Sequence, residues 1–478
     1  MMQPSKFNLR VPLPESGEVF LMNTLTDAQL IVPADIASLL DRLSDNPDAF
    51  TPQERTREGV SPTPLNQDER EALTALTEHG FIVPSRQADD DAVARFFTDI
   101  REDADSLRVT VLTTLQCNFA CDYCFQGDHG DHNKHADKMS PDTSEQVARW
   151  INARMDELHP KRLTITFFGG EPLVNLPALY DLAERAKKST DERGVELTIG
   201  IISNGLLLTE ELVDRLLPLG LTYVKITLDG DRDAHNRMRP LRGGQGTFDR
   251  IVENISKVAG KVRIAIGGNF DASTVESYPA LLDFLKAQDF ADKLVKVAFK
   301  PIIREKAVPK GVIPLTVISD KPLAGTCMTV AGSGGSSICD TCAFVDDQLS
   351  HLREETKKRG FPTIDGVHMG PCEIHKKHAY TIGPNGSLYA CPGFTGEPTL
   401  STGHIDDRKD SWRMSAAERF EHLAAWHKCG DCAFIPVCAG GCSVASHTEL
   451  GDMNMPTCHK KSFESALVSL AHEAASAS

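Results

Sequence analysis

Between residues 107 and 299 the chain alternates six times between a short run rich in β-forming residues and a run with helical periodicity. A helix between two strands carries the chain back across the sheet, so this alternation predicts parallel strands. Six units favour an open, partial (β/α)6 barrel over a closed barrel of eight units. The expected strands are Leu107–Leu115, Leu163–Phe168, Leu197–Ile202, Tyr223–Leu228, Val262–Ile266 and Leu294–Phe299. One expected helix begins at Ser140-Pro141. The other expected helices are Leu176–Lys188, Glu210–Leu217, Phe248–Val258 and Val275–Ala287.

Residues 1–105 follow a different pattern, which predicts a small, separate α+β domain. Asn66 and Glu69 have the spacing of a capping box, which starts a helix that Gly80 ends. The polar residues 46–64 predict a loop, and the charged segment Gln87–Asp105 predicts a connector to the barrel. The other expected elements are three strands and a helix, at Phe7–Val11, Val19–Asn23, Gln29–Val32 and Ala34–Leu43.

The barrel is expected over residues 106–310, and three further parts follow it. Residues 311–370 form a linker or bridging region, because Gly325–Ser337 is rich in glycine and serine. Residues 371–462 hold seven of the thirteen cysteines and show little helical periodicity, so bound metal is expected to stabilise this part. Residues 463–478 form a C-terminal helix or tail.

The net charge of −16 at pH 7 disfavours nucleic acid and anionic membrane surfaces as partners. No apolar run reaches the roughly 18 residues that a membrane span needs, and the N-terminus lacks the apolar core of a secretory signal. These features predict a cytoplasmic protein. Stable disulfides are rare in that compartment, so the clustered cysteines indicate metal binding.

Cys117, Cys121 and Cys124 directly follow the first expected strand, with three and then two residues between them. Three thiolates on one tight loop suit an iron–sulfur cubane and leave one iron open to another ligand. A zinc site is the alternative, with His129 or His132 as the fourth ligand. The spacing alone does not decide between these two sites.

Three further motifs follow the next three expected strands. They are Phe168-Gly-Gly-Glu-Pro172, Ser203-Asn-Gly205 and Thr227-Leu-Asp-Gly230, and Arg239 comes twelve residues after Thr227. Each motif alone is typical of an ordinary turn. The carboxyl ends of parallel strands meet on one rim, where barrels of this kind place their active sites. The cysteine loop and the three motifs together therefore indicate a functional site on that rim.

The cysteine loop, the Gly-Gly-Glu-Pro turn and the Thr-Leu-Asp-Gly strand end together resemble the radical S-adenosylmethionine (SAM) superfamily, over Leu107 to His459. The resemblance implies a partial (β/α)6 TIM-like barrel with a [4Fe-4S] cluster on the three cysteines of the loop. It implies that the open iron binds the amine and the carboxylate of SAM. One electron from the cluster then cleaves SAM to methionine and a 5′-deoxyadenosyl radical, which abstracts hydrogen from the substrate.

The resemblance also implies which residues contact SAM. Tyr123 matches a position near the adenine, and the glycine-rich turn matches one that meets the methionine amine. Thr227, where many relatives have serine, and Arg239 match contacts to the ribose and the carboxylate. No catalytic acid or base is implied. The expected cofactor-binding residues are Tyr123, Gly169, Gly170, Glu171, Ser203, Thr227 and Arg239.

A second array of seven cysteines reads C-x13-G-x4-C, then C-x2-C-x5-C-x3-C and one last cysteine. A zinc ribbon is one interpretation of such pairs. The full order resembles the SPASM extension of the same superfamily, which holds two auxiliary [4Fe-4S] clusters. In that extension Gly386 would form the turn between the first two cysteines. The resemblance implies one cluster on Cys429, Cys432, Cys438 and Cys458, and the other on Cys372, Cys391 and Cys442.

Seven ligands leave one iron of the auxiliary clusters without an assigned residue. Relatives often use a further cysteine shortly after the first one of the array, where this chain has His375 and His378. The candidates upstream are Cys327, Cys339 and Cys342, with Cys342 preferred. The alternatives are an iron open to substrate, and three ordinary free thiols.

SPASM enzymes mostly modify peptides, and residues 1–105 resemble the small winged-helix domain that binds leader peptides in maturases of ribosomal peptides (RiPPs). The resemblance implies cross-linking, epimerisation or oxidation of a precursor peptide, whose leader segment adds a strand to a sheet edge. It also implies a reductase, a flavodoxin or a ferredoxin as electron donor. A packing or dimerisation role is the alternative for this domain.

Two other functions are alternatives. The first is sulfatase maturation, which forms formylglycine. In those enzymes an aspartate follows the second cysteine of the array, whereas Pro392 follows Cys391 here. The second is a non-catalytic iron–sulfur or zinc scaffold, against which the complete cysteine triad and the rim motifs argue.

Overall fold

The computed structural model describes residues 2–45, 66–124, 126, 136–303, 337–368, 370–406 and 421–477, with side chains in the helix after residue 336 described from residue 344 onward. Within these residues no helix is long and apolar enough to cross a membrane. The predictions that lie outside them concern the loop 46–64, nearly all of the linker Gly325–Ser337, His129, His132, Cys327 and the side chains of Cys339 and Cys342.

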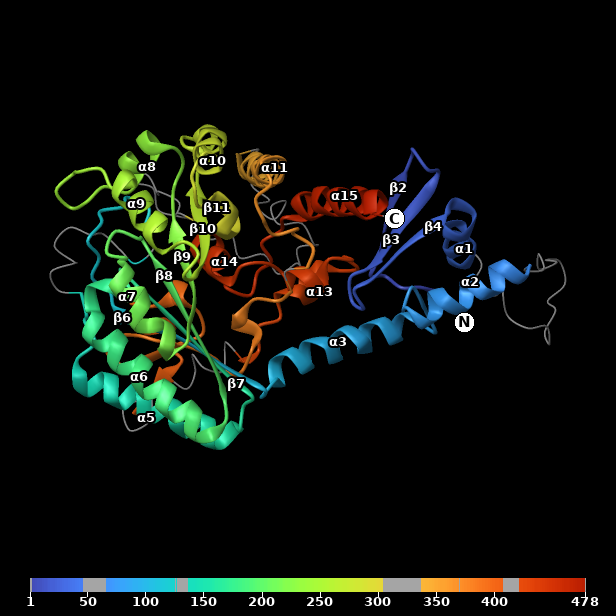
Figure 1. Ribbon diagram of the computed structural model, residues 1–478. Coiled ribbons are helices and arrows are strands. Elements are labelled where there is room, and N and C mark those ends of the chain that lie inside the picture. The colour runs from blue at the N-terminus through green and yellow to red at the C-terminus, as the bar shows by residue number, and fades with distance from the viewer. Residues whose placement is uncertain are drawn as a thin grey trace, which may run out of the picture.

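The largest sheet begins at one edge with six strands that are parallel and adjacent in chain order. These strands are β6 (Ser106–Thr114), β7 (Arg162–Gly169), β8 (Glu196–Ser203), β9 (Leu221–Thr227), β10 (Arg263–Phe270) and β11 (Leu294–Pro301). The helices between them are α5 (Pro141–Leu158), α6 (Leu176–Arg193), α7 (Glu210–Leu216), α8 (Arg232–Met238), α9 (Phe248–Val258) and α10 (Tyr278–Lys286). The α/β fold with the parallel sheet of a partial barrel is thus confirmed, and Figure 1 shows the helices along the outer side of the strands.

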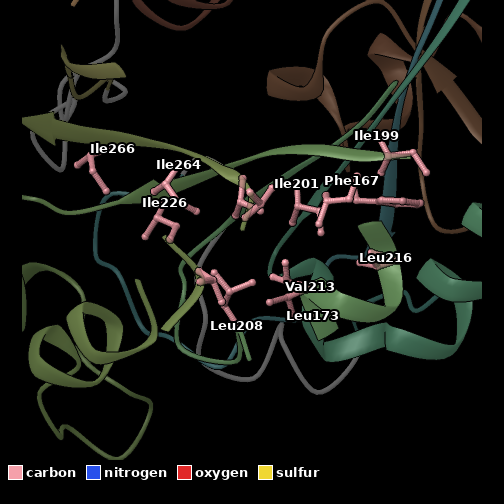
Figure 2. Close-up of a cluster of buried hydrophobic side chains, with 14 of the residues drawn as sticks. Phe167, Leu173, Ile199, Ile201, Leu208, Val213, Leu216, Ile226, Ile264 and Ile266 are labelled. Carbon is pink, nitrogen blue, oxygen red and sulfur yellow. The ribbon is translucent and has the colours of Figure 1, made fainter. Parts of the chain in front are cut away.

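The helices pack on one face of the sheet because alternate strand residues are apolar there. Phe167 of β7 and both Ile199 and Ile201 of β8 are fully buried in the main core. Figure 2 shows them in one group with Val213 and Leu216 of α7. Burial of each such side chain contributes about 1.5–3 kcal/mol, which fixes the helices against this face.

The opposite, concave face of the same strands is polar. Thr166 of β7, Gly200 of β8 and Tyr223 of β9 are partners in register, so they share this face. A Cβ on Gly200 would lie 2.1 Å from Cζ of Tyr223, so the glycine leaves room for the ring. The Tyr223 hydroxyl lies 3.1 Å from Oγ1 of Thr166. The barrel therefore has a hydrogen-bonding interior beneath its carboxyl rim.

Three short C-terminal strands extend the same sheet beyond β6. The first is β12 (Ala379–Ile382), which pairs parallel with β6. Then β13 (Ser387–Tyr389) and β14 (Gly403–His404) follow in antiparallel order. The sequence did not predict this join. It places the part of the chain that carries Cys372 and Cys391 beside the strand that leads into the first cysteine loop.

The N-terminal unit is an antiparallel sheet that packs on both faces. One face contacts two helices through Leu21, Leu39 and Leu76, and the other contacts the C-terminal helix α15 through Phe20 and Leu467. Figure 1 shows the sheet beside α15. Asn66 and Glu69 form the expected capping box. The elements are β1 (Gln3–Pro4), β2 (Asn8–Leu13), β3 (Glu18–Asn23), β4 (Ala28–Pro33), α1 (Ala34–Asp45), α2 (Gln67–Glu78), β5 (Ile82–Val83) and α15 (Lys460–Ala477).

The charged connector expected at Gln87–Asp105 is a helix, α3 (Arg86–Glu102), which the sequence did not predict. Most residues of this helix are charged or polar, and only a narrow strip of apolar side chains packs against other parts of the chain. Val93 is buried beside Phe7, and Phe97 stacks on Trp426 with ring centroids 4.7 Å apart. In Figure 1, α3 runs from the N-terminal sheet to the barrel. The connection between the two parts is therefore a helix with packed apolar side chains.

The contact between α15 and the N-terminal sheet is expected to stabilise the whole chain. Leu467→Ala removes a buried side chain from this contact and should lower the free energy of unfolding by about 2–4 kcal/mol. Urea denaturation of the variant measures the change. Val468→Ala is the control, because Val468 is 44% exposed on the same helix. Equal losses in the two variants would contradict the packing described here.

Candidate functional site

Cys117, Cys121 and Cys124 lie in one loop at the carboxyl end of β6, as expected. Burial raises the pKa of the Cys117 thiol to about 12 and that of the Cys121 thiol to about 11. Each of these pKa values is raised further by the next thiol along the loop, so consecutive thiols lie within electrostatic range of each other. None of the ten cysteines in the described part of the chain forms a disulfide. The loop thus offers three neighbouring sulfur donors.

Glu171 is fully buried and ties the ends of the first three barrel strands together. One carboxylate oxygen accepts hydrogen bonds from the Ser203 hydroxyl at 2.8 Å and the Leu173 N–H at 3.1 Å. The other oxygen accepts the N–H of Asn204 at 2.7 Å. The N–H of Glu171 itself donates to the carbonyl of Gln116 at 2.9 Å, directly before the first cysteine. Burial raises the pKa of Glu171, while these donors lower it.

Gly169 and Gly170 pack directly on the backbone that leads into the cysteine loop. A Cβ on Gly169 would lie 2.2 Å from the carbonyl oxygen of Thr114, and a Cβ on Gly170 would lie 2.3 Å from that of Gln116. The N–H of Gly170 also donates to Thr114 at 3.0 Å. The glycines therefore bring two strand ends together, a role that the sequence did not reveal. Their contact with the methionine amine stays a prediction.

Tyr123 joins a buried polar group with Asp229, Arg239 and Asn269. The Tyr123 hydroxyl hydrogen-bonds to the Asp229 carboxylate, and Nη1 of Arg239 donates to that hydroxyl at 2.5 Å. The N–H of Asn269 donates to the other carboxylate oxygen of Asp229 at 2.7 Å. Nε of Arg239 is buried and has no hydrogen-bond partner within the described residues. This group can therefore still donate to an anionic ligand.

Arg239 belongs to this polar group and also acts electrostatically on the cysteine loop and the glycine-rich turn. Its positive charge lowers the pKa of both Cys117 and Glu171. Six of the seven predicted SAM contacts thus come together. The seventh, Thr227, ends β9 opposite Gly267 and two residues before the buried Asp229.

His235 supports the polar group from behind and was not predicted from the sequence. Its Nδ1 accepts the N–H of Asp229 at 3.2 Å, and its Nε2 lies 3.0 Å from Oγ1 of Thr247. The Thr247 hydroxyl donates to the carbonyl of Arg239 at 2.8 Å. Burial lowers the pKa of His235 well below its usual value, so the ring is neutral and carries its proton on Nε2. The neutral ring thereby orients both charged residues.

Electrostatic effects on the pKa values of the second array link the cysteines within each of the two groups that the resemblance implies, and their role as cluster ligands stays a prediction. Burial raises the pKa of Cys438 to about 12. The charges of three other cysteines raise this pKa further: Cys429, Cys458 and Cys432. Burial also raises the pKa of Cys391 to about 12, and Cys372 and Cys442 raise it further. The second group is thus Cys372, Cys391 and Cys442. No set of three His, Cys, Asp or Glu in the described residues has the geometry of a single-ion site.

Gly386 adopts the left-handed conformation, φ 88°, that the expected turn between Cys372 and Cys391 requires. Cys342 lies in α11 (Ser337–Lys358), among the residues whose side chains are not described. His375 is buried, and its Nε2 has no hydrogen-bond partner within the described residues. The fourth ligand of this group stays a prediction.

His375 makes stability depend on pH. Burial lowers its pKa from 6.5 to about 4, so below pH 6.5 the unfolded chain binds a proton that the folded protein does not. The stability is complete above pH 6.5 and is lost as the pH falls toward 4. Between pH 6.5 and 4 the free energy of unfolding of His375→Gln should fall by about 2–3 kcal/mol less than that of the parent protein. Urea denaturation of the metal-free protein measures both values. His472→Gln, at an exposed position of α15, is the control. Equal losses in parent and variant would contradict the assignment.

The fold and this rim define a class of protein, a barrel enzyme with three thiols beside a buried carboxylate and guanidinium. The sequence profile of the Radical SAM superfamily matches residues 111–270, which contain the cysteine loop, the glycine turn and the polar group. Residues 111–270 thus form a domain of the radical SAM superfamily.

Comparison with individual proteins shows several similar enzymes. An Fe-coproporphyrin III synthase of Methanosarcina barkeri is 25% identical over 191 residues, which is 40% of this chain and 42% of that protein. A GTP 3′,8-cyclase of Synechococcus sp. is 31% identical over 170 residues, 34% of this chain and 44% of that protein. The chain thus spans less than half the length of these two relatives. A cysteine-type anaerobic sulfatase-maturating enzyme of Clostridium novyi is 23% identical over 338 residues, 68% of this chain and 84% of that protein.

Solved structures show a similar fold. Native anSMEcpe with bound AdoMet matches with a TM-score of 0.56 at 18% identity, over 77% of this chain and 99% of that one. The same protein with bound AdoMet and the Cp18Cys peptide matches with a TM-score of 0.55 at 16% identity, over the same shares of the two chains. These matches establish the fold of the chain.

Proposed function

We propose that this protein binds a [4Fe-4S] cluster on Cys117, Cys121 and Cys124 and uses it to cleave SAM reductively. The observation that carries the proposal is the position of these three thiols beside Glu171 and Arg239 on one rim. Three sulfur donors fit a cluster that keeps one iron open. When bound, the cluster would supply the electron that converts SAM into methionine and a 5′-deoxyadenosyl radical.

The residues around the thiols fit the binding of SAM. Arg239 has a buried Nε without a partner within the described residues, which suits the SAM carboxylate. Tyr123 lies between Arg239 and Asp229, and we assign it to the adenine side. Glu171 has all its acceptor contacts inside the protein, so it positions the backbone of the turn for the methionine amine.

Binding of SAM to the cluster is testable by electron paramagnetic resonance (EPR). The dithionite-reduced holoprotein should give a [4Fe-4S] signal whose shape changes when SAM is added, because SAM becomes a ligand of the open iron. A signal that is identical with and without SAM, in protein with its full iron content, would contradict the proposal.

We further propose two auxiliary [4Fe-4S] clusters on the two thiol groups of the second array. The proximity of the thiols within each group supports this proposal. Three clusters require about twelve irons per chain after anaerobic reconstitution. A chain with about four irons and bound zinc would overturn the auxiliary assignment. Cys342 remains the preferred fourth ligand of the group that contains Cys372, and Cys342→Ala should change the EPR signal of that cluster alone.

We propose a precursor peptide as the substrate, with cross-linking, epimerisation or oxidation as the modification. The similarity to a sulfatase-maturating enzyme and to a structure with a bound peptide supports this class. Strand β4 ends the N-terminal sheet and has one partner, β3, within the described part of the chain. A leader segment could pair with this edge. A reductase, a flavodoxin or a ferredoxin would deliver the electrons.

The product of any short reading frame found next to the gene is the peptide to test. After incubation with the reduced holoprotein and SAM, cross-linking or oxidation should have removed two hydrogens from the peptide. Epimerisation should leave the mass of the peptide unchanged in H2O and add one deuterium in D2O. A peptide that neither binds nor changes, while SAM is cleaved, would contradict this substrate. Sulfatase maturation is the second candidate, favoured by the Clostridium novyi relative. It predicts formylglycine in a sulfatase-derived cysteine or serine peptide, which the first candidate does not.

A further inference from the structure

Three lysines project from the concave face of the barrel. Lys225 of β9 is opposite Ala265 of β10 in register, and Ala265 is opposite Lys296 of β11. Lys300 lies four residues farther along β11 and therefore on the same face. Between the last two, Val297 points to the helix side and is fully buried. The register thus places three cations together on the side of the sheet that the helices do not cover.

The charges of Lys296 and Lys300 act on Lys225. The side chain of Lys225 lies across Gly267, where an added Cβ would come within 2.6 Å of its Cε. Burial, together with the charges of Lys300 and Lys296, lowers the pKa of Lys225 to about 8. Among the residues that the structure describes, no carboxylate forms a salt bridge with any of the three.

Such a cluster is unusual in this chain, which has 67 acidic and 51 basic residues. Carboxylates are abundant, yet they pair with lysines elsewhere, as Glu473 does with Lys357. Lys225 is partly buried, whereas Lys296 and Lys300 are exposed, so the repulsion among the three cations acts chiefly on the charge of Lys225. An anion bound among them would remove this repulsion, which points to a ligand that the chain itself does not supply.

The cluster lies between the proposed SAM site and the second cysteine array. Lys300 is opposite Asn269 in register, and Asn269 donates to both Asp229 and Tyr123. On the other side, burial raises the pKa of Cys391 and the charge of Lys300 opposes that shift, so the ammonium lies within electrostatic range of this thiol. A ligand held by the lysines would therefore lie next to the place where the radical forms.

We infer that Lys225, Lys296 and Lys300 form a subsite that binds a carboxylate of the peptide substrate, from an Asp or Glu side chain close to the residue that is modified. The inference rests on the proposed function, because it needs a peptide in the barrel. Lysine ammonium groups are mobile point charges, so they suit a carboxylate that arrives on a flexible chain. The carboxylate of SAM is the other possible source of the anion, and the experiment separates the two.

The probe is a pool of acetylated, amidated heptapeptides with Asp or Glu at the centre, beside the same pool with Asn or Gln. Immobilised, reconstituted holoprotein should retain the acidic pool about tenfold more than the amide pool, as expected for a charge-assisted contact. The triple variant Lys225→Gln, Lys296→Gln, Lys300→Gln should lose this preference. Lys188→Gln, Lys293→Gln, Lys461→Gln removes the same charge from exposed positions elsewhere and should keep it. Iron content and circular dichroism establish that both triple variants are folded.

Saturating SAM separates the two sources. The acidic pool should remain bound when SAM is present, since the subsite lies beside the SAM site and not in it. Displacement of the pool by SAM would overturn the inference in favour of the SAM carboxylate. Equal retention of the two pools, or equal preference in the two triple variants, would overturn it as well. Failure of the proposed function shows differently, as absence of 5′-deoxyadenosine in the parent protein whatever the peptide retention.

Discussion

Cys121→Ala should reduce the formation of 5′-deoxyadenosine below detection and remove about four irons per chain. Cys121 is the central thiol of the loop; it raises the pKa of Cys117, and Cys124 raises the pKa of Cys121. Two thiolates cannot hold three corners of a cubane, so the whole cluster is lost. Liquid chromatography with mass spectrometry measures the nucleoside, and a colorimetric assay measures the iron.

Cys429→Ala provides the comparison for this variant. It removes a thiol from a group of the second array, so it should also lose iron, yet the EPR change on addition of SAM should persist. The two variants therefore separate the cluster that binds SAM from an auxiliary one. Retention of the SAM-dependent EPR change in Cys121→Ala would contradict the assignment of the loop.

Glu171→Gln should have the second largest effect. The carboxylate is fully buried and accepts three hydrogen bonds, from Ser203, Leu173 and Asn204. A glutamine presents an amide donor to at least one of these donors, which leaves a buried group unsatisfied and costs about 1–3 kcal/mol. The strand ends that form the rim then separate, so SAM cleavage should fall by about 5- to 150-fold.

Urea denaturation and a SAM titration measure the two effects of Glu171→Gln. The control is Glu192→Gln, at an exposed position of α6. A variant with parental stability and parental affinity for SAM would show that Glu171 does not organise the rim. A loss of stability with unchanged affinity would assign it a purely structural role.

The barrel was readable from the sequence because its signals are local. The strand Leu163–Phe168 and the helix Phe248–Val258 alternate apolar and polar residues within one element, and the structure contains both. The capping box at Asn66 is equally local. The helix α3 was missed because its apolar edge is narrow and its partners, Phe7 and Trp426, come from distant parts of the chain.

Long-range pairing explains the other omissions. The residues of β12 do not predict its pairing with β6, about 270 positions earlier, because a strand of four residues can pair with many sheet edges. The same holds for α15, because its amphipathic pattern predicts a buried face but not that this face packs on the N-terminal sheet. These contacts depend on the complete fold.

The candidate site was predictable as far as motifs reach. The strand-end motifs named Tyr123, Glu171 and Arg239, and the structure brings these together. His235 and the three lysines of the concave face carry no motif, since only helix packing or strand register places them near the rim. A periodicity argument along β11 would have put Lys296 and Lys300 on one face, but it could not supply Lys225.

One measurement tests the central claim most directly. Anaerobically reconstituted protein is incubated with SAM and dithionite, and 5′-deoxyadenosine and methionine are quantified by liquid chromatography and mass spectrometry. The account predicts that both products form in equal amounts and only when reductant is present. Protein that carries its full complement of iron and sulfide, yet forms no 5′-deoxyadenosine, would contradict it.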